Sequence, residues 1–146
     1  MASNIEKFDT TVVLALAELY ARFPMRYNLS TNKYMLTDDG LHEEGFSPRE
    51  EAYLDVKDPY FVRKEFAFEC VNWLVEAGYV NGKPVAYSRI ENAVLSAKGL
   101  ALLKATPNSL QEGLGEKLQA AVKNGIGATG RALITQLVTL GVKYVG

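Results

Sequence analysis

A long amphipathic segment followed at once by two short β-prone runs occupies residues 58–87, and few folds accommodate that order. Asp58 can cap a helix by accepting a backbone N–H, and Pro59 suits the first helical position because no N–H is needed there. Gly78 stands where a helix often ends on a left-handed residue. Apolar side chains recur between these signals at helical spacing, namely Phe61, Val62, Phe66, Cys70, Trp73, Leu74 and Ala77. The pattern predicts a helix over residues 59–77.

A hairpin and a short helix are expected to follow. Short β-branched or aromatic runs around an Asn-Gly pair are typical of a hairpin, and residues 79–80 and 85–87 flank such a pair within Asn81–Pro84. The sequence therefore predicts a turn at residues 81–84. The apolar run 93–95 predicts a further short strand, and the next residue, Ser96, can cap a helix through Leu103. Pro107 is expected to close that helix.

The first helix of the chain is predicted from capping and spacing. Asp9 or Thr10 can cap it, and Pro24 ends it because proline disfavours helical geometry in the residue before it. Its apolar positions recur at helical spacing and are Val12, Val13, Leu16, Leu19, Tyr20 and Phe23. Trp73 shares the apolar stripe of the 59–77 helix, so we expect it to be buried between that helix and this one.

An acidic insert of about residues 28–58 separates these two helices. It carries eight acidic and three basic residues. Ser47 followed by Glu50 has the spacing of a capping box, in which the side chain of each residue accepts the backbone N–H of the other residue. A short helix from Pro48 to about Val56 is therefore expected.

Two segments resemble the winged helix-turn-helix superfamily. Residues 73–80 read WLVEAGYV, and residues 93–103 read AVLSAKGLALL. In bacterial regulators of the MarR and PadR kind, the recognition helix typically ends on a leucine, any three residues, a glycine and then a tyrosine or leucine. After the wing, these regulators continue with a leucine, a threonine or serine, any two residues, a glycine, any two residues and two leucines. The resemblance covers about residues 61–104. It implies an α+β fold, a mostly helical winged-helix domain with a small β-hairpin wing, in which residues 61–77 match the helix that enters the DNA major groove.

The charge of that helix disfavours DNA binding. The whole chain has 16 basic and 17 acidic residues, a net charge of −1, and lacks the positive excess of a protein that coats nucleic acid. Residues 61–77 contain two bases and three acids, whereas base readout needs Arg, Lys, Asn or Gln at the base edges. The candidate phosphate contacts are Arg63, Lys64, Lys83 and Arg89.

Enzymatic and metal sites are not expected. A chain with one histidine, His42, and one cysteine, Cys70, lacks a His pair or a multi-thiolate metal centre. The acidic cluster at residues 38–44 lacks the alternating ligands of a calcium loop, so a solvated loop is expected. Cys70 lies on an apolar stripe, where a thiol acts as a small hydrophobe. Residues 125–131 lack the Gly-Lys-Ser/Thr ending of a phosphate loop and are expected to break a helix. We expect no cofactor.

The last 40 residues suggest self-association. Ser109 and Glu112 have capping-box spacing, and the helix after them has an apolar stripe of Leu110, Leu114, Leu118, Ala121 and Val122. The final helix has a wide apolar arc that needs cover. Its own domain, a second copy or a membrane surface could provide that cover, and we favour a second copy, most simply in a dimer. The oligomerisation candidates are Leu133, Ile134, Leu137, Val138 and Val142.

These patterns predict a winged-helix-like domain over residues 1–106 and a helical C-terminal extension over residues 107–146. We expect a cytoplasmic protein, because the sequence does not open on a basic segment with an apolar core and has a single cysteine. The predicted function is a non-enzymatic regulatory or scaffolding module that binds protein partners and self-associates. The alternative is a DNA-binding transcriptional regulator.

Overall fold

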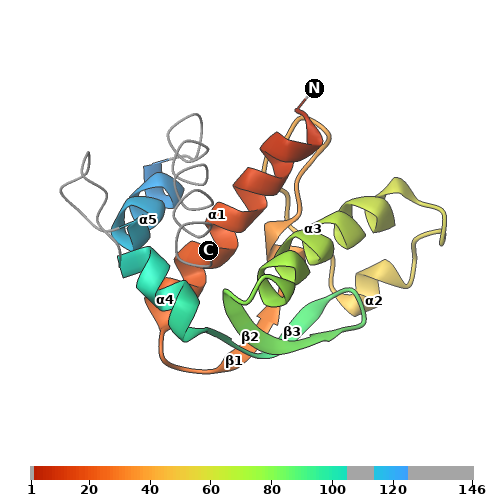
Figure 1. Cartoon of the computed structure of the whole chain (residues 1–146). Helices are drawn as coiled ribbons and strands as arrows, with labels where there is room; N and C mark the ends of the chain where they lie inside the picture. Colours follow the sequence, from red (N-terminus) through yellow and green to blue (C-terminus); the bar gives the residue numbers. More distant parts are fainter. Residues whose placement is uncertain (1, 105–113, 125–146) are drawn as a thin grey trace.

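The computed structural model describes residues 2–104 and 114–124, which form a three-stranded antiparallel sheet covered by helices (Figure 1). This mixed architecture agrees with the predicted α+β class. In chain order the elements are α1 (Asn4–Arg22), β1 (Tyr27–Ser30), the 3-10 helix η1 (Thr31–Tyr34), α2 (Pro48–Glu51), α3 (Pro59–Glu76), β2 (Val80–Val85), β3 (Arg89–Leu95), α4 (Ala97–Lys104) and α5 (Leu114–Asn124).

The core lies between the sheet and the central helix. Figure 1 shows α1 with α3 on one side and α5 on the other, and α1 contacts both helices. The sheet has the order β1-β3-β2, so β3 is central and contributes the buried side chains Ile90, Ala93 and Leu95. The helices contribute apolar side chains to the same cluster, among them Val13, Leu16, Leu19, Val71, Leu74, Leu103 and Leu118.

The hairpin forms, but its predicted turn at residues 81–84 is wrong. β2 continues through that segment, with Val80 opposite Leu95, Val85 opposite Arg89 and an irregular register between Asn81 and Lys83. Gly82 is needed there for close approach, since a Cβ on it would lie 2.5 Å from the side chain of Ile90. The turn is at residues 86–88, where Ala86 and Tyr87 have left-handed φ angles of 56° and 54°. Neither residue type favours that backbone, so the sequence carries no signal for this turn.

The ends of α3 are as predicted, but its buried face is not. The Asp58 side chain accepts the N–H of Tyr60 at 2.9 Å, and Gly78 has a φ of 87°. The buried positions are Tyr60, Ala67, Phe68, Cys70, Val71 and Leu74, whereas Val62 and Trp73 are exposed. The face is rotated because α3 packs on η1 and β2 as well as on α1.

Tyr60 is buried because its hydroxyl has partners. It donates to Glu51 Oε2 at 2.7 Å and accepts the N–H of Phe46 at 2.9 Å. Burial first, and then the hydrogen bond to Glu51, raise the pKa of Tyr60 to about 12. The predicted apolar stripe did not include this residue, because the stripe was placed on a different face of the helix.

Side-chain caps fix three other helix starts. Ser47 and Glu50 form the predicted capping box, although α2 ends at Glu51 and is shorter than expected. The Ser96 hydroxyl accepts the N–H of Gly99 at 3.0 Å, which confirms the predicted start of α4. The predicted start of α1 is wrong, because Ser3 caps a helix that begins at Asn4.

The helix α5 shares the core of the preceding residues. Leu118 and Ala121 are buried in the main cluster, and the Tyr20 hydroxyl of α1 donates to Glu116 at 2.8 Å. The described part of the predicted extension therefore packs within the chain, on α1. The capping box at 109–112, Pro107, the glycine-rich segment and the five oligomerisation candidates at 133–142 lie outside the described residues. Within the described ranges, no helix is long and apolar enough to span a membrane.

Candidate functional site

An apolar groove of about 270 Å³ lies between the start of α1 and the middle of α3. The α1 side is formed by Asn4, Ile5 and Phe8, and the α3 side by Phe66, Glu69, Cys70 and Trp73. The Phe8 and Trp73 rings meet edge to face with their centroids 5.4 Å apart, which joins the two helices at this point. The exposed fraction is 70% for Ile5 and 41% for Trp73, so large apolar side chains form its accessible edges.

Trp73 is therefore not the buried anchor that its stripe predicted. Its ring does contact the first helix through Phe8, as expected, but one side of it faces the groove. The prediction of burial is wrong because the core-facing line of α3 passes through Val71 and Leu74. With those two residues facing the core, Trp73 lies at the edge of the contact between α1 and α3.

Cys70 lines the groove as an apolar group. It is buried, and burial together with the nearby Glu69 charge raises its pKa to about 12. The thiol is therefore protonated at neutral pH, whereas a nucleophilic cysteine needs a thiolate. This agrees with its predicted role as a small hydrophobe.

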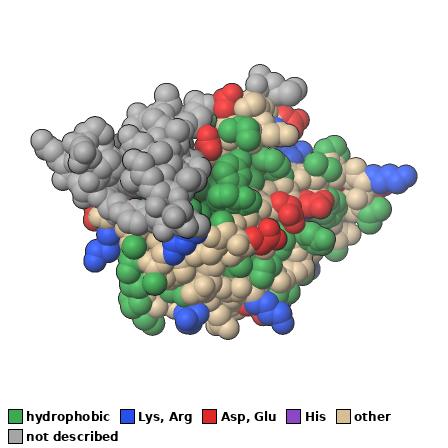
Figure 2. All heavy atoms as spheres, in the orientation of Figure 1, with side chains coloured by type: hydrophobic (Ala, Val, Ile, Leu, Met, Phe, Trp, Pro, Cys, Tyr) green, Lys and Arg blue, Asp and Glu red, His purple; other side chains and the backbone are tan. Residues whose placement is uncertain are grey.

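Acidic side chains border the groove on the α3 side. Glu69 lines it, Glu65 is exposed one turn earlier, and Glu76 is exposed two turns later. Figure 2 shows hydrophobic side chains next to acidic ones over the region of α1 and α3. Among the residues that the structure describes, no Lys or Arg lines this groove. The surface thus combines apolar area with negative charge.

Three of the four candidate phosphate contacts are paired with carboxylates of the chain itself. Arg63 Nε lies 2.8 Å from Glu43 Oε1, and Lys64 Nζ lies 2.9 Å from Glu51 Oε1. The latter pair is largely buried, with side chains 15% and 12% exposed. Arg89 pairs with Glu91 at 3.0 Å on β3, and Lys83 is exposed on β2. A phosphate would have to displace these carboxylates to reach the paired cations.

The acidic cluster at residues 38–44 forms a loop. His42 pairs with Leu36 in an isolated β-bridge, and its Nε2 lies 2.6 Å from the Lys33 carbonyl oxygen. Asp38 and Asp39 are exposed. Across residues 2–104 and 114–124, no group of three His, Cys, Asp or Glu side chains is placed to hold a metal ion.

A second, wider hollow of about 840 Å³ lies between β1, η1 and the segment of residues 44–50, which includes the start of α2. It is lined mostly by polar side chains, among them Asn28, Asn32, Lys33, His42 and Arg89. Its two cations already have partners, because Lys33 pairs with Glu18 and Arg89 with Glu91. An anionic ligand in this hollow would therefore have to compete with Glu18 for Lys33 and with Glu91 for Arg89.

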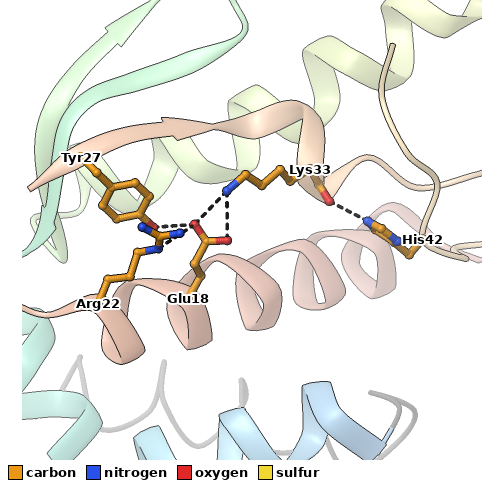
Figure 3. A network of polar contacts seen from close by, with 5 residues as sticks. All are labelled: Glu18, Arg22, Tyr27, Lys33 and His42. Atoms are coloured by element: carbon orange, nitrogen blue, oxygen red, sulfur yellow. Dashed lines mark hydrogen bonds and ion pairs between the residues drawn. The ribbon is translucent and has the colours of Figure 1, made fainter. Parts of the chain in front are cut away.

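Glu18 organises the polar contacts between α1 and the first strand (Figure 3). Its carboxylate accepts the Tyr27 hydroxyl at 2.6 Å and the Lys33 ammonium at 3.1 Å, and Arg22 lies 3.8 Å away. Burial acts to raise the pKa of Glu18, but the hydrogen bonds from Tyr27 and Lys33 outweigh it and lower that pKa. Burial, followed by the bond to Glu18, raises the pKa of Tyr27. These contacts hold β1 and η1 against α1.

Glu18→Gln is expected to reduce the pH dependence of stability. The folded-state pKa of Glu18 lies below its ordinary value of 4.5, so the carboxylate contributes stability above pH 4.5 that is lost as pH falls through the folded-state pKa. We expect the variant to be less stable than the wild type by about 1 kcal/mol at pH 7, and by less at pH 3. Urea unfolding at both pH values measures this, with exposed Glu65→Gln as the control. A difference that is the same at both pH values would contradict it.

The groove between α1 and α3 is the candidate functional site, because it exposes large apolar side chains of both helices, Ile5 and Trp73, beside the acidic side of α3. Two of its residues, Asn4 and Ile5, precede the predicted start of α1, so the sequence does not place them on this helix. The signal that could have found them is Ser3 followed by Glu6, which has capping-box spacing. No protein family model, curated protein or solved structure matches this chain.

Proposed function

We propose that this chain is a winged-helix module of the cytoplasm that binds a protein through the groove between α1 and α3, has no enzymatic activity, and self-associates. The order of the elements supports the winged-helix part of the proposal. A long helix, α3, is followed directly by an antiparallel hairpin of β2 and β3 and then by the short helix α4, as the resemblance implies.

The observation that carries the protein-binding part is the surface of α3. A helix that reads DNA needs basic and amide side chains toward the duplex. Here Glu65, Glu69 and Glu76 are exposed, while Arg63 and Lys64 are held by carboxylates. Bringing three carboxylates to a phosphate backbone costs free energy, whereas an apolar groove with a polar edge suits a protein interface.

Trp73 adds to the case for a protein partner. Tryptophan is enriched among the residues that dominate the binding energies of protein interfaces. Trp73 is held in place by Phe8 and by Tyr79, whose ring centroid is 6.2 Å away. A preordered aromatic ring loses little conformational entropy when a partner binds.

The alternative function, a DNA-binding regulator, is favoured by one observation. Lys83 is exposed on the hairpin that follows α3, at the place of the wing. In that case Lys83 and the cations of α3 would contact phosphates. The two functions predict opposite effects of the acidic residues on α3.

Duplex DNA titration separates the two functions. We expect the wild type to show no binding to mixed-sequence duplex DNA at tens of micromolar in low salt. The double variant Glu65→Lys, Glu69→Lys replaces two negative charges by two positive ones and so raises the net charge by about four. It should keep the fold and bind DNA nonspecifically, with an affinity that falls steeply with salt. The matched control is Asp38→Lys, Asp39→Lys, which adds the same charge on the exposed loop and should bind similarly. Micromolar wild-type binding that only the α3 variant loses would refute the proposal.

A further inference from the structure

We infer that the groove between α1 and α3 accepts one large apolar side chain of a basic amphipathic helix from a partner protein. This inference rests on the proposed function and specifies the partner's chemistry. The groove volume of about 270 Å³ is below the range of about 300–1,000 Å³ that is usual for small-molecule sites. It suits a single anchoring side chain rather than a whole metabolite.

The walls of the groove select an apolar anchor. Ile5 and Phe8 stand opposite Phe66 and Trp73, and the neutral thiol of Cys70 lies between them. Val62 is exposed one turn before Phe66 on α3 and extends the apolar surface along that helix. An aliphatic or aromatic side chain placed there would remove these groups from water, which is favourable by about 25 cal/mol per Å² of apolar area.

The charges beside the groove select a basic partner. Glu65, Glu69 and Glu76 recur at intervals of four and seven residues, so they follow one side of α3 parallel to the groove. A partner helix with Lys or Arg at the same intervals could pair with all three. An acidic helix would be repelled, because no described cation lines the groove to offset the carboxylates.

The partner is expected to be helical because the groove runs between two helices. An amphipathic helix places apolar residues at i, i+3, i+4 and i+7 into such a groove and keeps its charged face outside. Strand addition is a poor fit here, because both walls are helical and have no free sheet edge.

Trp73 makes the inference directly measurable. It is the single tryptophan of the chain and lies in the groove, so its emission reports occupation of the groove. The probe is a tryptophan-free helical peptide of leucine and lysine with the leucines at i, i+3, i+4 and i+7. The matched peptide has every lysine replaced by glutamate. With the full chain, we expect the lysine peptide to shift Trp73 emission to shorter wavelength and to bind at least about tenfold more tightly than the glutamate peptide.

Two variants locate the binding. Ile5→Asp places a charge at the groove edge on a side chain that is 70% exposed, so the fold should persist, and binding of the lysine peptide should fall about tenfold or more. The control, Val56→Asp, changes a side chain that is 87% exposed and outside the groove, and should leave binding unchanged. Glu69→Lys should reduce the preference for the lysine peptide over the glutamate peptide.

The outcomes separate this inference from the proposed function. Equal binding of the two peptides, or equal effects of Ile5→Asp and Val56→Asp, would overturn the basic amphipathic partner. Failure of both peptides to bind would also overturn the basic amphipathic partner. The proposed protein-binding function would still stand in that case, as long as the wild type does not bind DNA. DNA binding by the wild type that is lost in the α3 charge variant would instead overturn the proposed function.

Discussion

Gly99→Ala is expected to lower the free energy of unfolding by about 3 kcal/mol, because a methyl group at this position has no space. A Cβ on Gly99 would overlap the carbonyl oxygen of Tyr79, and that oxygen accepts the backbone N–H of Ser96 at 3.0 Å. The obstacle is backbone, so a side-chain rotation cannot relieve it. The start of α4 would have to move away from the end of α3, and the Ser96 hydrogen bonds at this junction would be strained.

The expected effect of Gly99→Ala is opposite in sign to the usual effect of this substitution in a helix. At an unobstructed helix position, alanine in place of glycine stabilises a protein by up to about 1 kcal/mol. Ala101→Gly, at an exposed position of the same helix, is the control and should cost about 1 kcal/mol. Urea unfolding of both variants measures the difference. A Gly99→Ala protein as stable as the wild type would show that α4 does not pack this closely on Tyr79.

Leu118→Ala is expected to destabilise the protein by about 3 kcal/mol, within the usual range for a buried leucine. Leu118 has 0% exposure and lies in the cluster that also contains residues of α1, so the substitution leaves a cavity in the main core. Val122, on the same helix, is 37% exposed, and Val122→Ala should cost less than about 1 kcal/mol. Thermal unfolding should show a clear decrease in Tm for the first variant only.

The same variant tests where α5 packs. If α5 covers α1 of its own chain, the loss of stability should not change with protein concentration. If α5 packed on a second copy, the stability of the wild type and the loss caused by Leu118→Ala would both depend on protein concentration, because association contributes stability by mass action. Equal and small effects of Leu118→Ala and Val122→Ala would place α5 outside the core.

Local signals predicted much of the fold. Asp58, Ser47 and Ser96 each cap a helix where the sequence expected one, because a capping side chain acts on its own neighbours. Gly78 closes α3 through another local signal, because glycine adopts the left-handed conformation without strain. A hairpin was also expected after α3, since two β-prone runs follow it.

The position of the turn between β2 and β3 is set by tertiary contacts and not by local sequence signals. The Asn-Gly pair at 81–82 is a strong turn signal, yet the close approach of Ile90 uses Gly82 inside a strand. The turn instead uses Ala86 and Tyr87 in left-handed conformations that their side chains disfavour.

The candidate site was predicted only in part. The acidic outer residues of α3 were visible in the sequence, and they already argued against DNA readout. The groove is not visible in the sequence, because the apolar stripe predicts Trp73 in the core and the predicted first helix begins after Ile5. Apolar residues occur on more than one side of α3, so periodicity alone does not decide whether the core-facing side contains Trp73 or Val71 and Leu74.

The ion pairs between the acidic insert and α3 make it harder for other anions to bind the two cations of α3. Glu43 and Glu51 belong to the same chain as Arg63 and Lys64, so they act as tethered ligands at a high effective concentration. A free anion or a DNA phosphate must compete with a carboxylate that never diffuses away. The acidic insert thus keeps Arg63 and Lys64 of α3 paired within the chain. The acidic side of α3 is then the part of the helix that remains accessible to other molecules.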